Sequence, residues 1–220
     1  MVKFFLDTAD IACLEHWKKT EIIHGVTTNP SNLSKAGSDP KKTIKKIIEL
    51  FEKKDVSIQV TETDPKKVYE QALRIKNLGS NVVVKIPCFI DYFPIIKQLV
   101  HEKTRINITL VFSPLQAIIM ANFGVTYISP FIGRLEDDNQ DGIQLIQNIA
   151  KIYNQQKYET KILGASLRTV THIQDAILAG ATVVTIPPLL CEQMTNNHLT
   201  NKGITQFLCD WKTVNTDQFP

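Results

Sequence analysis

Short apolar runs alternate with amphipathic helical patterns along the whole chain, and this alternation constrains the fold more than any other feature. The runs are rich in Val, Ile and Thr and are almost continuously apolar, as strands are when helices cover both faces of a parallel sheet. Eight strands are therefore predicted, near residues 2–7, 24–28, 56–61, 82–86, 106–111, 125–129, 160–165 and 182–186.

The segments between the predicted strands carry signals for the ends of helices. Gly124 and Gly180 stand where helix ends need a residue in the left-handed conformation. A further helix is predicted over residues 199–211. Three helix starts combine a capping side chain with proline at the first helical position. They are Ser38-Asp39-Pro40, Asp64-Pro65 and Ser113-Pro114.

Eight strands alternating with eight helices predict an α/β fold, a (β/α)₈ TIM barrel. Residues 1–220 are expected to form a single domain, with residues 199–220 as an extra C-terminal helix and tail. The tail from residue 213 to 220 is expected to be frayed or used at a subunit contact. A doubly wound open sheet is the alternative, but no strand is followed by a Gly-x-Gly-x-x-Gly motif or a phosphate loop.

Composition narrows the classes of partner. A net charge of only +3 argues against nucleic acid and against a membrane surface. The five histidines are scattered without the spacing of metal ligands, so no metal is expected. The N-terminus does not resemble a signal peptide, and no apolar run is long enough for a membrane span, so a cytoplasmic location is predicted. The four cysteines are interpreted as free thiols; they are Cys13, Cys88, Cys191 and Cys209.

Lys85 is the one ionisable residue in the apolar run Val82–Pro87. Burial in such a strand disfavours the charged amine and lowers its pKa. A neutral amine in a closed pocket attacks carbonyl carbons, and the usual product is a Schiff base. The alternative is a lysine at the end of a strand whose amine reaches out to solvent.

Polar residues recur at the C-terminal ends of the predicted strands, where TIM barrels place their chemistry. An apolar barrel should not tolerate so many without a use, because each unpaired buried polar group costs roughly 1–3 kcal/mol. Each also has a plain structural explanation. Asp7 could cap the next helix, Asn29 could form a turn, and Arg134 could pair with Glu136 or Asp138. The set is Asp7, Thr27, Asn29, Gln59, Lys85, Asn107, Thr109, Arg134, Ser166 and Arg168.

This set suggests a lyase or transferase that acts on a phosphorylated sugar. Lys85 would form an imine, which draws electrons from the neighbouring carbon–carbon bond. Asp7 would move the proton of the adjacent hydroxyl. Arg134, Ser166 and Arg168 would bind the phosphate, since the planar guanidinium matches its oxygens.

Several segments resemble the signature segments of the small transaldolases, within the transaldolase/fructose 6-phosphate aldolase family. The resemblance covers nearly the whole chain. The combination of Gly-Val-Thr-Thr-Asn-Pro with the lysine strand is specific. The segments are Leu6-Asp7-Thr8-Ala9-Asp10, Gly25-Val26-Thr27-Thr28-Asn29-Pro30-Ser31, Val83-Val84-Lys85-Ile86-Pro87, Asn107-Ile108-Thr109-Leu110-Val111-Phe112 and Ser129-Pro130-Phe131-Ile132-Gly133-Arg134.

The resemblance implies a Schiff-base enzyme of the pentose phosphate pathway without metal or organic cofactor. It would move a dihydroxyacetone unit from sedoheptulose 7-phosphate to glyceraldehyde 3-phosphate. Lys85 would be the imine lysine and Asp7 the acid/base, Thr109 would help to hold the catalytic water, and Asn29 and Asn107 would contact sugar hydroxyls. Small transaldolases form homo-oligomeric rings, pentamers or decamers, in which the C-terminal helix reaches a neighbour.

Two residues point in different directions within the family. Gln59 stands where transaldolases usually carry Glu, and fructose 6-phosphate aldolases carry Gln. Phe131 stands where those aldolases carry Tyr and transaldolases carry Phe. An aldolase that releases free dihydroxyacetone is therefore an alternative, and a catalytically weak barrel that only binds sugar phosphates is another.

Overall fold

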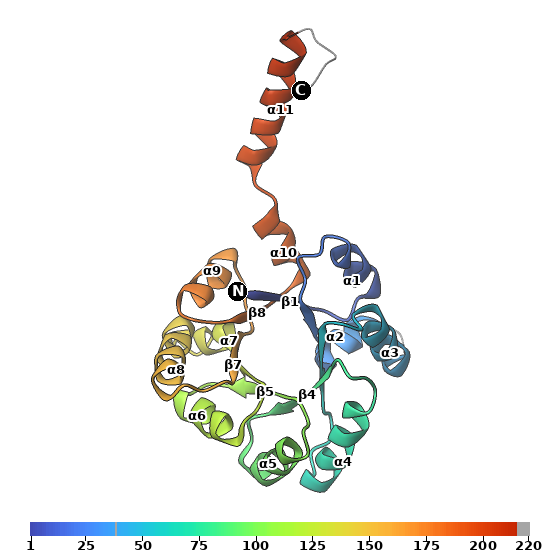
Figure 1. Cartoon of the computed structure of the whole chain (residues 1–220), viewed down its shortest axis with the longest axis vertical. Helices are drawn as coiled ribbons and strands as arrows, with labels where there is room; N and C mark the ends of the chain where they lie inside the picture. Colours follow the sequence, from blue (N-terminus) through green and yellow to red (C-terminus); the bar gives the residue numbers. More distant parts are fainter. Residues whose placement is uncertain (38, 215–220) are drawn as a thin grey trace.

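The chain folds into a closed barrel of eight parallel strands surrounded by helices, in a computed structural model that describes residues 1–37 and 39–214 (Figure 1). Each strand pairs in parallel with the next, and β8 closes the barrel by pairing with β1. The predicted (β/α)₈ barrel is confirmed, and the open sheet is wrong. Of the predicted tail, residues 213–220, Thr213 is the last residue of a helix, and residues 215–220 lie outside the described residues.

The observed strands agree with the predicted ones to within two residues at every end. Apolar, β-branched runs therefore located the strands of the barrel correctly. The strands are β1 (Lys3–Asp7), β2 (Gly25–Thr27), β3 (Asp55–Gln59), β4 (Val82–Pro87), β5 (Ile106–Val111), β6 (Tyr127–Pro130), β7 (Lys161–Gly164) and β8 (Val183–Ile186).

The helices are more numerous than one per connection. The additional α2, α7 and the 3₁₀ turn η1 span three to six residues each, too few for a helical period to be read from the sequence. The helices are α1 (Ile11–Lys18), α2 (Pro30–Lys35), α3 (Pro40–Leu50), α4 (Pro65–Lys76), η1 (Ile90–Tyr92), α5 (Phe93–His101), α6 (Pro114–Phe123), α7 (Ile132–Glu136), α8 (Gly142–Gln156), α9 (Val170–Leu178), α10 (Pro188–Thr195) and α11 (His198–Thr213).

The predicted helix ends are confirmed. The side chains of Asp39 and Asp64 accept backbone N–H bonds at the starts of α3 and α4. Ser113 and Gln116 form a reciprocal capping box at the start of α6. Gly124 ends the same helix with φ of 83°, a conformation that glycine adopts without strain.

Side chains fill the N-terminal half of the barrel and thereby confine open space to the other half. Phe5 and Tyr127 meet edge to face, with ring centroids 5.9 Å apart, and pack with Val83, Leu163 and Val183. The Tyr127 hydroxyl donates to the Asp55 carboxylate at the start of β3. This end of the barrel is therefore a packed plug, and a cavity opens only above it.

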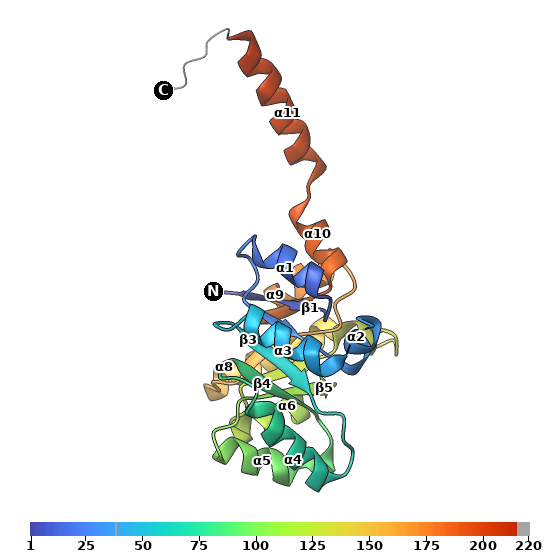
Figure 2. The same ribbon diagram turned by 90° about the vertical axis from the view of Figure 1, so that its right-hand side faces the viewer.

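Helix α11 projects away from the barrel, as Figures 1 and 2 show from two directions. None of its described residues is buried. Its bounds, His198–Thr213, agree with the predicted C-terminal helix. Across residues 1–37 and 39–214, the helices are all too short or too polar to cross a bilayer.

Candidate active site

A cavity of about 400 Å³ opens at the C-terminal ends of the strands. Its volume suits a small-molecule substrate. Most of the predicted site residues line this cavity, and they come from seven different strands or strand ends. Those that line it are Asp7, Thr27, Asn29, Gln59, Lys85, Thr109, Phe131, Arg134 and Ser166.

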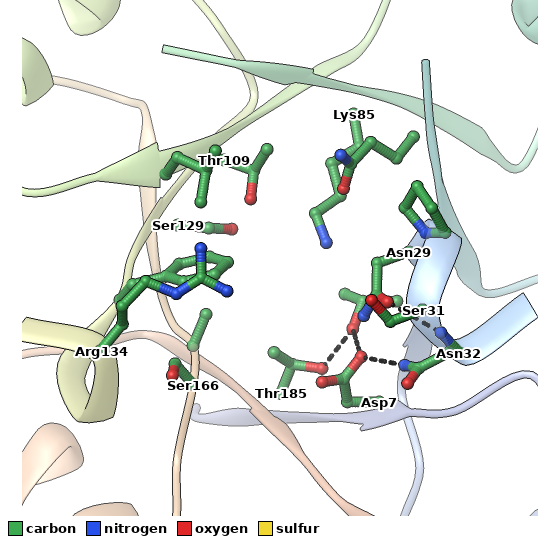
Figure 3. Close-up of a pocket in the computed structure, with 16 residues that line it drawn as sticks. Asp7, Asn29, Ser31, Asn32, Lys85, Thr109, Ser129, Arg134, Ser166 and Thr185 are labelled. Carbon is green, nitrogen blue, oxygen red and sulfur yellow. Dashed lines mark hydrogen bonds between the residues drawn. The ribbon is translucent and has the colours of Figure 1, made fainter. Parts of the chain in front are cut away.

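Lys85 extends from β4 into the middle of the cavity, as Figure 3 shows. The residue is only 5% exposed, and its Nζ donates to the Thr28 carbonyl oxygen at 3.2 Å. Burial lowers the pKa of the amine, and the nearby charge of Asp7 opposes that shift. The solvent-reaching alternative for this lysine is therefore wrong.

Asp7 ends β1 and faces the cavity below Lys85 in Figure 3. Its Oδ1 accepts two hydrogen bonds, from Thr27 Oγ1 at 3.1 Å and from Asn32 Nδ2 at 2.9 Å. Burial raises the pKa of this carboxyl, whereas the charge of Lys85 and the two hydrogen bonds lower it. Asp7 does not cap the following helix, because Asp10 fills that role.

A hydrogen-bond relay extends behind Asp7 to the last strand. Thr27 Oγ1 and Thr185 Oγ1 lie 2.6 Å apart, and both residues are buried. A hydroxyl has one proton, so a Thr27 that donates to Asp7 accepts from Thr185. The sequence interpretation missed Asn32 and Thr185. Thr185 stands in register with Phe5 on the neighbouring β1, and this pairing was not visible from the sequence.

Thr109 presents a hydroxyl that has no hydrogen-bond partner among the described protein atoms. The residue is 1% exposed and lines the cavity beside Ser129 (Figure 3). An unpaired buried hydroxyl is unfavourable unless a ligand or water satisfies it.

Two strained residues border the cavity. Leu110 has φ of 59°, within an irregularity where β5 and β6 shift register between Ile108 and Val111. Ser166 also has φ of 59°. Left-handed conformations of such residues cost free energy and tend to occur at functional sites. Neither the composition nor the hydrophobic periodicity of the sequence predicted these two conformations.

The far wall of the cavity carries Arg134 and Ser166, opposite the side of Asn29, Ser31 and Asn32 (Figure 3). Arg134 Cζ lies 5.1 Å from the centre of the Phe131 ring, a cation–π arrangement that holds the guanidinium toward the cavity.

The alternative pairing of Arg134 with nearby carboxylates is not what the structure shows. Glu136 Oε2 lies 3.1 Å from His172 Nε2. Asp138 instead accepts a hydrogen bond from Gln140. The guanidinium of Arg134 is therefore paired with neither carboxylate, and Arg134 lines the cavity.

Two predicted site residues lie elsewhere. Asn107 is fully buried below the cavity, where its Nδ2 donates to Ser57 Oγ at 3.2 Å and its Oδ1 accepts from Ser129 Oγ at 2.7 Å. Arg168 follows β7 and is not among the residues that line the cavity; both of its guanidinium NH₂ groups bond the Asp137 carboxylate.

None of the cysteines is among the described residues that line the cavity. The four cysteines are free, as predicted. Burial raises the pKa of the Cys88 thiol to about 11, so it is protonated and weakly reactive at neutral pH. Within residues 1–37 and 39–214, no three His, Cys, Asp or Glu side chains are grouped closely enough to hold a metal ion.

The fold and the site define a TIM-barrel protein with a polar cavity built around a buried lysine and a carboxylate. Residues 4–218 match the family described as Transaldolase/Fructose-6-phosphate aldolase. The chain therefore belongs to the transaldolase/fructose 6-phosphate aldolase family, and this membership supports a transaldolase-type enzymatic activity.

Curated relatives of this chain are named probable transaldolases. A probable transaldolase of Dinoroseobacter shibae is 43% identical over 96% of this chain and 97% of its own length. A probable transaldolase of Nitrosopumilus maritimus is 41% identical over 98% and 97%. Among solved structures, a mandelate oxidase variant superposes with a TM-score of 0.59 at 10% identity. It covers 84% of this chain and 64% of the oxidase, and it supports the barrel fold alone.

Proposed function

We propose that this protein is a transaldolase of the pentose phosphate pathway that works through a Schiff base on Lys85. It would transfer a dihydroxyacetone unit from sedoheptulose 7-phosphate to glyceraldehyde 3-phosphate. The observation that carries the proposal is the buried Lys85 amine, which points into the cavity toward the Asp7 carboxylate.

The first step forms the imine. The neutral Lys85 amine attacks the ketose carbonyl carbon, and the resulting carbinolamine loses water to give a protonated imine. The lowered pKa of Lys85 favours this step, because only the neutral amine has a free electron pair.

The second step breaks the carbon–carbon bond. Asp7 accepts the proton of the hydroxyl beside that bond, the bond breaks, and its electron pair moves into the imine to give an enamine. The aldehyde product leaves. The acceptor aldehyde then reacts with the enamine, Asp7 returns the proton to the new hydroxyl, and hydrolysis of the imine releases the product ketose.

The hydrogen bonds from Thr27 and Asn32 fix the orientation of the Asp7 carboxylate. Asn29 uses its Oδ1 to cap α2, so its side-chain amide N–H groups are available to sugar hydroxyls in the cavity. We propose that Asn107 does not contact the sugar but holds Ser129 and Ser57 in place beneath the substrate through its two hydrogen bonds.

A water molecule leaves when the imine forms and another is taken up when the imine is hydrolysed, and we propose that two residues act on this water. The unpaired Thr109 hydroxyl can bond a water molecule, and the Gln59 amide can orient it. An amide cannot take a proton from that water as a carboxylate would. Slow hydrolysis should leave the enamine waiting for an acceptor aldehyde, which favours transfer over simple cleavage.

Arg134 and Ser166 are the groups that we propose to bind the substrate phosphate at the far wall. The mild positive charge of the chain agrees with anionic sugar phosphates as substrates. The Phe131 ring beneath Arg134 keeps this wall apolar on one side.

The second candidate is a fructose 6-phosphate aldolase, and Gln59 is the observation that favours it. An assay of fructose 6-phosphate without an acceptor aldehyde distinguishes the two. A transaldolase should release dihydroxyacetone at least tenfold more slowly than it transfers it, a difference of about 1.4 kcal/mol in barrier. Equal rates would favour the aldolase.

Borohydride trapping tests the mechanism directly. The enzyme is reduced in the presence of fructose 6-phosphate, and peptide mass spectrometry locates the adduct. We expect a reduced adduct on Lys85, which a Lys85→Met variant should lack although it remains folded. The absence of an adduct in a folded wild-type protein that still binds the sugar would refute the mechanism and favour a binding barrel.

We also propose that copies of this chain assemble through α11 into a homo-oligomer, a ring pentamer or decamer. Ile204, Phe207 and Leu208 are 53%, 73% and 58% exposed on this projecting helix. An isolated helix of its 16 residues would be only marginally stable, and an apolar face of this kind favours a protein partner. The free thiols agree with a reducing cytoplasm, where we propose that the enzyme works.

A further inference from the structure

The pair formed by Arg168 and Asp137 holds one of the predicted phosphate ligands away from the cavity. Both NH₂ groups of Arg168 donate to the two carboxylate oxygens of Asp137. The cavity wall itself is formed by Arg134 and Ser166. The inference drawn from this pair rests on the proposed function, because it concerns how a phosphorylated substrate is selected.

Arg168 lies directly against the helix that supplies Arg134. The backbone N–H of Gly133 donates to the Ser166 carbonyl oxygen at 3.0 Å. A Cβ atom on Gly133 would lie 2.6 Å from Arg168 Nε and 2.9 Å from Arg168 Cδ. Glycine at this position therefore lets the arginine stem pass across α7, one residue before Arg134.

The backbone around Arg168 is fixed, so only its side chain has to move toward the cavity. The N–H of Arg168 lies 3.4 Å from His172 Nδ1, and His172 in turn pairs with Glu136. Ser166 is fixed in its left-handed conformation by the bond from Gly133. The charges of both Arg168 and Arg134 act on Asp137, so the two guanidinium groups lie near one carboxylate.

Asp137 carries a charge that acts on both arginines. Hydrogen bonds from Arg168 lower the pKa of this carboxyl, and the charges of Arg168 and Arg134 lower it further. It is therefore ionised at neutral pH. The side chains of Arg168 and Asp137 are 49% and 53% exposed, and ion pairs at that exposure are weak. A substrate phosphate can compete for the same two N–H groups, because phosphate matches the guanidinium fork as a carboxylate does.

We propose that Asp137 is a specificity-determining residue, an internal anion that competes with the substrate phosphate for Arg168. In the free enzyme the Asp137 carboxylate is bound to the guanidinium of Arg168, and the phosphate of a sugar substrate has to displace that carboxylate. The apparent affinity for phosphate is then reduced by the fraction of molecules in which Arg168 is engaged. Sugars without a phosphate are not subject to this competition.

The Asp137→Asn variant tests the competition, with Asp138→Asn as the matched control. Both changes remove one negative charge from an exposed position, but Asp138 bonds Gln140 instead of an arginine. Inorganic phosphate is titrated into each folded variant by calorimetry, and KM is measured for fructose 6-phosphate and for unphosphorylated dihydroxyacetone. We expect Asp137→Asn to lower the phosphate Kd and the KM for fructose 6-phosphate by about three- to tenfold. The KM for dihydroxyacetone should remain unchanged.

Arg168→Met completes a double-mutant cycle. It should raise the phosphate Kd, and adding Asp137→Asn to it should give no further gain, because the two changes act on one interaction. The proposal is overturned if Asp137→Asn leaves the phosphate Kd unchanged, if Asp138→Asn lowers it equally, or if the gain persists without Arg168. The calorimetric titration needs no turnover, so a missing Lys85 adduct would refute the proposed reaction while leaving this result interpretable.

Discussion

Replacement of Thr109 by valine should stabilise the protein and impair it at the same time. Valine has nearly the shape of threonine, with a methyl group in place of the hydroxyl. The Thr109 hydroxyl is buried and has no partner among the described protein atoms, so the free enzyme carries an unsatisfied polar group. Such a group destabilises the folded state by roughly 1–3 kcal/mol.

The low end of that range is used for the expected gain. We expect the free energy of unfolding to rise by about 1 kcal/mol and Tm by about 2–4 °C for a chain of this size. The turnover number should fall by about 100-fold if Thr109 orients the water of imine formation and hydrolysis.

Two other threonines serve as controls. Thr104 is 5% exposed and its hydroxyl is also unpaired among the described atoms, but it lies in the loop before β5, away from the cavity lining. Thr104→Val should stabilise to a similar degree and leave turnover unchanged. Thr27 is paired with Asp7 and Thr185, so Thr27→Val should destabilise by about 1–3 kcal/mol.

Urea denaturation with a common m-value measures the stability of each variant, and a coupled transfer assay measures turnover. A Thr109→Val protein less stable than wild type by about 1 kcal/mol or more would refute the packing argument. A stabilised variant with wild-type turnover would refute the role of Thr109 in catalysis.

Three further predictions concern charge, specificity and assembly. Burial lowers the folded-state pKa of Lys85, so between that value and its ordinary 10.5 the unfolded chain binds more protons. In that pH range the free energy of unfolding of wild type should therefore rise with pH relative to that of Lys85→Met. Denaturant titrations at several pH values measure both, and an equal pH dependence in the two proteins would contradict this. Phe131→Tyr should increase the release of dihydroxyacetone in the absence of an acceptor aldehyde. An unchanged rate of release would refute the idea that this position distinguishes transaldolases from aldolases. Paired substitutions Phe207→Ser and Leu208→Ser should reduce the sedimentation coefficient, whereas Leu178→Ser, which replaces a residue 76% exposed on α9, should not.

The sequence was sufficient for the barrel because strand and helix patterns are local. Apolar runs such as Val82–Pro87 place strands, and capping residues such as Asp64 and Ser113 place helix starts. In a closed parallel barrel all strands point the same way. The polar residues after each strand therefore meet at one end, and this is why Lys85, Asp7 and Arg134 could be grouped from local patterns alone.

The depth of each side chain was beyond the reach of the sequence. Asn107 and Thr109 share one face of β5, but the stagger of the strands puts Asn107 below the cavity and Thr109 in its wall. The register irregularity at Leu110 depends on how β5 meets β6, a contact between strands that no local pattern encodes.

The sequence by itself determined the barrel, the buried lysine and the end of the barrel at which the chemistry gathers, because these follow from local periodicity and from the parallel direction of the strands. Only the tertiary structure decided that Asn32 and Thr185 hold the Asp7 network and that Arg168 is bound to Asp137. A long exposed side chain has several partners within reach, and the choice among them depends on the packing of segments that are distant in the chain.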